Sequence, residues 1–183
     1  MNKLFINLVK PILILILTIG VCMQIEANDN LLLMELKSGN VTIEMKPEIA
    51  PNHVKRIKQL VREKFYDGLK FHRVIDGFMA QTGDPLGNGT GGSGQNIDAE
   101  FSSAKHIKGT VSMARARDPN SADSQFFICL ADAPHLDEQY TIWGQVIEGM
   151  ENVDKIKKGE GNNGAVIGEP DIIISLKLKS EKE

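Results

Sequence analysis

The sequence predicts a mainly β domain, in which a closed antiparallel sheet is capped at its ends by two amphipathic helices. Short strand-like stretches recur along most of the chain, turn residues separate them, and only two segments have helical spacing. Many short strands with few helices are typical of antiparallel barrels. The 183 residues, 42% hydrophobic and 25% charged, suit one domain with a sizeable core.

The N-terminal segment, residues 1–27, has the order of a secretory signal peptide. Lys3 and Lys10 precede an apolar run from Ile12 to Val21, and Ala27 offers a small residue at a cleavage point. The run is shorter than the ~20 residues that a membrane span needs. We therefore expect a mature domain of residues 28–183, either periplasmic or secreted. The alternative is an uncleaved signal that serves as a single anchor, so that contact with a membrane would be limited to residues 1–27.

The two cysteines do not predict a disulfide. Cys22 falls in the signal segment, and Val21 before it is too large for a typical lipobox. Cleavage would leave Cys129 alone, within the apolar run Phe126–Leu130. A lone cysteine in such a run is predicted to be buried and unreactive.

The mature chain begins with two strands, Leu31–Leu36 and Val41–Met45, around a tight turn at Ser38–Asn40. In the second strand, apolar residues alternate with Thr42 and Glu44, which is the period of a half-buried strand. The two strands are therefore predicted to form a hairpin.

A helical segment follows from Asn52. Its apolar residues fall on one face at helical spacing: Val54, Ile57, Leu60 and Val61. The basic residues lie on the other face and are predicted to face solvent without forming a ligand site: Lys55, Arg56, Lys58 and Arg62.

The rest of the chain consists of short strands, one glycine-rich loop at residues 83–94 and a second helix at Met150–Lys157. The loop lacks the Gly-Lys-Ser/Thr ending of a phosphate-binding P-loop. The remaining predicted strands are Lys70–Ile75, Phe78–Thr82, Thr110–Ala114, Gln125–Leu130, Thr141–Val146 and Ile172–Leu178.

Strand faces point to a pocket outside the core. Period 2 puts Gln125 and Phe127 on one face of their strand and Phe126 and Ile128 on the other. The purely apolar face belongs in the core, whereas the face that pairs an amide with a ring suits an outward pocket. Arg73 lies in an otherwise apolar strand, where an arginine needs a partner or water. An edge arginine that reaches solvent is the alternative for Arg73.

Several segments resemble cyclophilins, in the order of that family. They are Phe71–Asp84, Gly87–Gly92, Gly109–Ala114, Ser124–Cys129, Leu136-Asp137 and Gly144–Met150, within a resemblance that runs from Leu31 to Leu178. The resemblance implies an eight-stranded antiparallel β-barrel with a helix at each end and a groove on its outer wall. It implies a peptidyl-prolyl cis-trans isomerase that needs no cofactor and acts on proline-containing segments of unfolded or exported proteins.

The resemblance also assigns the site. By its motif, Arg73 is the catalytic residue. The residues implied to bind substrate are Phe78, Met79, Gln81, Ala114, Arg115, Gln125, Phe127, His135, Leu136 and Tyr140.

Two positions depart from many eukaryotic cyclophilins. His135 stands where those members have a tryptophan, and Tyr140 stands where they have a histidine. Since that tryptophan is associated with tight cyclosporin binding, we expect cyclosporin to bind this chain weakly. The alternative function is a catalytically weak chaperone or scaffold that binds proline peptides. Such relatives usually lose the arginine or the pocket aromatics, which this chain keeps.

Other classes of ligand are disfavoured. The net charge is −3 and the basic residues are scattered, so no nucleic-acid partner is predicted. None of the four histidines stands in a metal-ligand motif, so no metal site is predicted. We expect His72 and His135 to lie near the groove, and His53 and His106 to lie at the surface or cap turns. Asp84, Asp98 and Glu100 are predicted to cap loops rather than to act as an acid pair.

Overall fold

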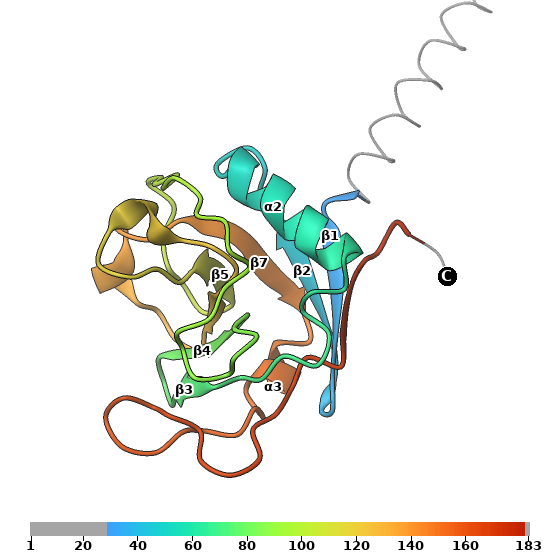
Figure 1. The fold of residues 1–183 in the computed structure, drawn as a ribbon, viewed down its shortest axis with the longest axis vertical. Coiled ribbons are helices and arrows are strands. Elements are labelled where there is room, and N and C mark those ends of the chain that lie inside the picture. The colour runs from blue at the N-terminus through green and yellow to red at the C-terminus, as the bar shows by residue number, and fades with distance from the viewer. Residues whose placement is uncertain (1–28, 182–183) are drawn as a thin grey trace, which may run out of the picture.

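The structure, a computed structural model, describes residues 29–181 and contains one eight-stranded antiparallel sheet with helices beside it (Figure 1). The proposed signal segment lies outside the described residues. The strand order is β3-β4-β6-β5-β7-β2-β1-β8. The strands are β1 (Leu31–Leu36), β2 (Gly39–Met45), β3 (Arg73–Ile75), β4 (Met79–Thr82), β5 (Thr110–Met113), β6 (Phe126–Cys129), β7 (Ile142–Glu148) and β8 (Ser175–Leu178). The mainly β, eight-stranded prediction is confirmed.

The sheet curls without closing, which corrects the expectation of a closed barrel. Strands β3 and β8 are its two edges, and no ladder joins them within residues 29–181. The segments next to them meet at an isolated bridge between Lys70 and Ile172, where the Phe71 N–H donates to the Asp171 carbonyl at 2.9 Å. The predicted strands Lys70–Ile75 and Ile172–Leu178 are shortened, because their first residues form this isolated bridge and do not join the ladders of the sheet.

Two apolar clusters lie on opposite sides of the sheet. The larger is the core, where the Trp143 and Phe126 rings meet edge to face with centroids 5.4 Å apart. The smaller contains Met79, Phe127, Cys129, Ala133 and Leu136. The prediction that Phe126 and Phe127 lie on opposite faces of their strand is therefore confirmed. Residues 83–94 form no strand or helix, as predicted.

Helix α2 (Pro51–Arg62) packs against β8, and helix α3 (Met150–Val153) packs against β2. Helix α3 is much shorter than the predicted Met150–Lys157. After Val153 the backbone tightens, since the Ile156 N–H bonds to the Val153 carbonyl three residues back. Two single 3₁₀ turns, η1 (Pro119–Ser121) and η2 (Pro134–Leu136), complete the elements. Across residues 29–181 we find no helix with the length and apolar character of a membrane span.

A remote carboxylate caps helix α2, whose N-cap residue Ala50 has no capping side chain. Glu100 accepts hydrogen bonds from the N–H groups of Asn52 (3.1 Å) and His53 (3.0 Å), and its negative charge suits the positive end of the helix dipole. Glu100 therefore caps a helix, where the sequence predicted that it would cap a loop. Asp84 likewise accepts bonds from N–H groups of its own loop, those of Leu86 and Asn88 among them.

Two histidine predictions are wrong. His53 and His106 are 0% and 1% exposed, instead of lying at the surface. His53 Nδ1 lies 2.6 Å from Glu100 Oε2, and His106 lies 3.1 Å from both Asp137 Oδ1 and Ser112 Oγ. These partners are far from the histidines in sequence, so the local pattern did not reveal the burial.

The buried histidines predict a stability that depends on pH. Burial lowers the pKa values of His53, His72 and His106 from their ordinary value of 6.5. The unfolded chain therefore binds more protons than the folded one below that pH, so stability is fully present above 6.5 and is lost as pH falls. We expect the free energy of unfolding, measured by urea denaturation at constant ionic strength, to be lower at about pH 5.5 than at about pH 7.5. Equal or greater stability at the lower pH would refute this.

Candidate active site

A cavity of about 170 Å³ opens on the side of the sheet away from the core. It gathers nine of the eleven site residues that the sequence predicts. Its lining is Arg73, Phe78, Met79, Gln81, Ala114, Arg115, Phe127, Leu136 and Tyr140. Gln125 lines an adjoining cavity, and His135 lines neither. We call the first of these the Arg73 cavity.

The floor of the Arg73 cavity is apolar. Met79 on β4 and Phe127 on β6 lie on the same side of the sheet, together with Leu136 from η2. The Tyr140 ring meets Phe127 edge to face, with centroids 5.8 Å apart. Beneath them, Cys129 is fully buried and burial raises its pKa to about 12, so it carries no thiolate at neutral pH. The prediction of a buried, unreactive cysteine is consistent with this.

Arg73 supplies a positive charge at the edge of this floor. Its Nη1 donates to Gln81 Oε1 at 3.1 Å, and its Nε donates to the carbonyl of Asn163 at 2.8 Å. Nη1 also lies 3.9 Å from the sulfur of Met79. Within residues 29–181 no carboxylate forms an ion pair with Arg73. The guanidinium is thus held by neutral groups, and its charge is not cancelled by a neighbour.

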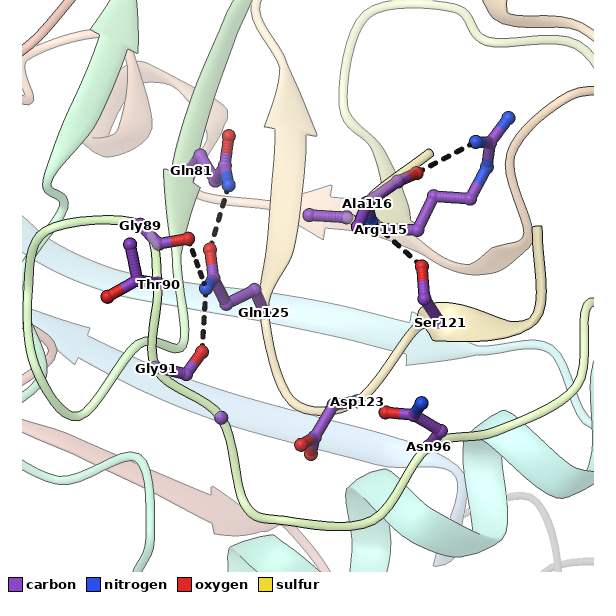
Figure 2. Close-up of a pocket in the computed structure, with 12 residues that line it drawn as sticks. Gln81, Gly89, Thr90, Gly91, Asn96, Arg115, Ala116, Ser121, Asp123 and Gln125 are labelled. Carbon is purple, nitrogen blue, oxygen red and sulfur yellow. Dashed lines mark hydrogen bonds between the residues drawn. The ribbon is translucent and has the colours of Figure 1, made fainter. Parts of the chain in front are cut away.

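A hydrogen bond to the amide of Gln125 holds the side chain of Gln81 in turn. Gln81 Nε2 donates to Gln125 Oε1 at 2.9 Å, and Gln125 Nε2 donates to the carbonyls of Gly91 (2.8 Å) and Gly89 (3.1 Å), as Figure 2 shows. The backbone carbonyls of Gly89 and Gly91 can only accept, so they turn the NH₂ group of Gln125 toward themselves. The oxygen of Gln125 then faces the NH₂ group of Gln81, and the oxygen of Gln81 faces Arg73. The glycine-rich loop therefore orients Arg73 through two glutamines.

The second cavity, about 280 Å³, shares Gln81, Ala114 and Arg115 with the Arg73 cavity. Arg115 lies at their boundary. Its guanidinium carbon is 4.6 Å from the centroid of the Tyr140 ring, and its Nη2 donates to the Gln139 carbonyl at 3.0 Å. The cation–π contact and the carbonyl hold Arg115 against the wall of the groove.

His135 is exposed and lies next to Phe78, a lining residue of the Arg73 cavity. Its ring centroid is 5.2 Å from that of Phe78, with the two planes tilted by 38°. His72 is partly buried, and Gly89 of the glycine-rich loop approaches its ring. Both histidines thus lie near the groove, as predicted.

The sequence did not predict the contribution of the segment after α3, which passes beneath β3 in Figure 1. It supplies the Asn163 carbonyl that accepts from Arg73. The Gly164 carbonyl accepts from the Val74 N–H at 2.8 Å, and a Cβ on Gly164 would lie 2.4 Å from Ile75 Cγ1. With φ at 69°, the position favours glycine on both grounds. The frequent glycines of this segment were the available signal.

The site has no evident metal ligands. Across residues 29–181, no group of three or more histidine, cysteine, aspartate or glutamate side chains could hold a metal ion.

Known proteins are similar to this chain in sequence and in fold. The family model described as cyclophilin type peptidyl-prolyl cis-trans isomerase/CLD matches residues 31–178. A protein of Brucella suis named probable peptidyl-prolyl cis-trans isomerase is 49% identical over 180 residues, which cover 90% of this chain and 91% of that protein. A Helicobacter pylori peptidyl-prolyl cis-trans isomerase is 45% identical over 132 residues, 69% of this chain and 80% of its own.

Solved structures agree with these relatives. A cyclophilin from Hirschia baltica superposes with a TM-score of 0.75 at 32% identity, over 85% of this chain and 76% of its own. A cyclophilin type isomerase from Cryptosporidium parvum, crystallised in the presence of the dipeptide Ala-Pro, has a TM-score of 0.73 at 29% identity, over 81% of this chain and 98% of its own.

Proposed function

Because this chain belongs to the cyclophilin family of peptidyl-prolyl cis-trans isomerases, we propose that the Arg73 cavity binds the proline ring of its substrate and that Arg73 is the catalytic residue. Members of this family bind proline-containing peptides. The proposal adds the roles of individual residues and the setting in which the enzyme works.

The reaction needs a group that recognises the twisted bond. Amide resonance gives the C–N bond its partial double-bond character and a barrier of ~18–20 kcal/mol. Twisting removes the resonance and leaves a lone pair on the prolyl nitrogen. A guanidinium that donates to this nitrogen stabilises the twisted state more than either planar state, and only such differential binding speeds the step. No nucleophile or proton transfer is required.

The neighbours of Arg73 support this role. The observation that carries the proposal is a guanidinium bonded to Gln81 and to the Asn163 carbonyl, without an ion-pair partner within residues 29–181, on the rim of an apolar cavity. The floor of Met79 and Phe127 would hold the proline ring while the other side of the bond rotates. It would also lower the local dielectric, which strengthens the interaction of Arg73 with the nitrogen. The remaining wall residues, Phe78, Gln81, Ala114, Arg115, Gln125, Leu136 and Tyr140, would position the peptide.

Weak inhibition by cyclosporin is expected because His135 offers less apolar surface than a tryptophan at that place. His135 is exposed and packs beside Phe78, which lines the cavity, so a tryptophan there would extend the apolar wall. The His135→Trp variant should therefore be inhibited at least about tenfold more strongly, since burial of an aromatic ring contributes one to several kcal/mol. The measurement is the cyclosporin concentration that halves isomerisation of a prolyl peptide. Nanomolar inhibition of the unmodified protein would contradict the expectation.

We further propose that the enzyme acts in the periplasm or outside the cell, on proline bonds of exported chains. The order of Lys3, Lys10, the apolar run Ile12–Val21 and Ala27 supports export. Uncatalysed X-Pro isomerisation takes tens to hundreds of seconds, so an isomerase there would shorten a slow folding step.

Fractionation of expressing cells, with N-terminal sequencing, tests this location. The expected result is a form beginning near Asn28 in the periplasm or the medium. Full-length protein found in the membrane fraction would favour the anchor alternative. Full-length protein confined to the cytosol would overturn the proposed location and leave the family assignment intact.

A further inference from the structure

A third cavity continues the groove toward helix α2. It has a volume of about 410 Å³ and is lined by Asn52, Lys55, Arg56, Gln59, Gln95, Asn96, Ile97 and Asp98. We call it the α2 cavity. It shares Asn96 with the second cavity, which in turn shares Arg115 with the Arg73 cavity. Figure 2 shows Asn96 at the side of the second cavity where the pale teal helix α2 passes. A continuous lining therefore connects the Arg73 cavity with the α2 cavity.

Arg56, on the wall of the α2 cavity, is not the solvent-facing residue that helical spacing predicted. It is only 9% exposed. Its Nη1 donates to Gln59 Oε1 at 3.0 Å and its Nη2 to Ser93 Oγ at 2.7 Å, while its buried Nε has no partner. A buried charge is costly unless an opposite charge and hydrogen bonds compensate it.

No carboxylate within residues 29–181 pairs directly with Arg56. Its link to an acid is indirect, because Ser93 Oγ also bonds to Asp123. The Asp123 carboxylate already accepts from the N–H groups of Ser93 (2.9 Å) and Gly94 (2.8 Å). Arg56 therefore lacks an anion of its own.

Other donors around the α2 cavity are also available. The ammonium group of Lys55 and the amides of Gln95 and Asn96 are exposed, and none has a hydrogen-bond or ion-pair partner within residues 29–181. The opposing charge in the lining is Asp98, which is exposed. Two cations and two unpaired amides thus face one carboxylate.

We propose that the α2 cavity binds a carboxylate side chain, from an aspartate or glutamate of the same polypeptide whose proline occupies the Arg73 cavity. The proposal rests on the proposed function, because the proline sets where the rest of the peptide lies. Continuity of the groove favours a side chain of the substrate over a separate molecule. An extended chain advances about 3.3–3.6 Å per residue, so the acidic residue would lie several positions from the proline. The enzyme would then prefer prolines with an acidic residue at one defined spacing.

A set of peptides with one X-Pro bond tests this preference. A single glutamate is moved from two to about eight residues from the proline on either side, with glutamine at the same place as the neutral match. At one spacing we expect kcat/KM for the glutamate peptide to exceed that for its glutamine match about fivefold, a size typical of a partly exposed charged contact. The gain should lie in KM rather than kcat, because the contact is remote from the rotating bond. It should shrink as salt is raised.

Charge variants locate the effect. Lys55→Gln should bring the glutamate-to-glutamine ratio close to one, and Asp98→Asn should raise it. Lys58→Gln is the matched control, because it removes the same charge from the same helix while its side chain is engaged elsewhere, with Asp29 and Asn30. The control should keep the ratio of the unmodified protein. If Lys55→Gln and Lys58→Gln lower the glutamate-to-glutamine ratio equally, the effect is one of general charge and the proposed site is wrong.

Inorganic phosphate separates a substrate side chain from a free anion. Phosphate should compete with the favoured glutamate peptide and leave its glutamine match unaffected. Equal kcat/KM values for both peptides at every spacing would overturn the proposal, even if phosphate binds the protein. Turnover of the glutamine peptides would then still support the proposed function. If no peptide is turned over, the proposed function fails, and the affinity ratio of the two peptides, measured by calorimetry, still decides the proposal.

Discussion

The Arg73→Ala variant should keep its fold and lose isomerase turnover by a factor of about 10²–10³. Removal of one pre-oriented donor from a developing charge typically costs about 3–4 kcal/mol of transition-state stabilisation. Arg73 lies on the edge strand β3 and is only partly buried, so its removal leaves the core intact. The measurement is kcat/KM for a prolyl peptide, together with the thermal unfolding midpoint.

The Arg73→Lys variant is the control for charge alone. Lysine keeps the charge, but it lacks the planar fork that donates to Gln81 and to the Asn163 carbonyl together. We expect its activity to lie between those of Arg73→Ala and the unmodified protein. Near-normal turnover by a folded Arg73→Ala protein would rule out the proposed catalytic role.

Substitution of two adjacent phenylalanines should affect different properties, stability for Phe126 and substrate binding for Phe127. Phe126 faces the core, edge to face with Trp143 and Tyr66, so Phe126→Ala should cost about 3–5 kcal/mol of stability. Phe127 faces the Arg73 cavity, so Phe127→Ala should chiefly raise KM by removing the floor that holds the proline ring. Urea denaturation and peptide kinetics on both proteins measure the two effects.

The milder variants Phe126→Leu and Phe127→Leu serve if an alanine variant does not fold. The same division is expected, with smaller changes, because leucine keeps most of the apolar volume. Equal stability losses with equal kinetic losses would contradict the assignment of these residues to separate clusters.

The sequence was informative about which side chains share a face of a strand. Alternation along β6 was enough to separate Phe126 from Phe127, because a strand sends neighbouring side chains to opposite faces. The same reasoning placed Gln125 on the side of Phe127, where the structure has it lining the groove. The resemblance to cyclophilins then brought residues from separate strands together, which periodicity alone does not do.

Prediction failed where the partner is distant in sequence. The pattern of helix α2 places Arg56 on its polar face, but a remote loop that includes Ser93 covers it. His53 is fully buried, and the carboxylate that bonds to it, Glu100, is 47 residues away. The Asn163 carbonyl that holds Arg73 is a backbone group 90 residues away, and no side-chain pattern marks it.

The prediction of a closed sheet also failed because closure depends on contacts between distant segments. The stretches Lys70–Ile75 and Ile172–Leu178 both have the composition of strands, which favoured full-length edges and a closed sheet. In the structure only the C-terminal parts of these stretches, β3 and β8, join the sheet. Whether two edges pair depends on the curl of the whole sheet, which is not encoded in either stretch alone.

The proposed mechanism is tested most directly by isomerisation of an X-Pro peptide with the protein beginning at Asn28, compared with Arg73→Ala at the same concentration. Peptide affinity is measured in parallel by calorimetry. The mechanism predicts rapid turnover by the first protein, and turnover reduced about 10²–10³-fold in the variant with peptide affinity largely retained. If both proteins bind the peptide and neither speeds its isomerisation, the chain is a proline-binding module and the catalytic role of Arg73 is wrong.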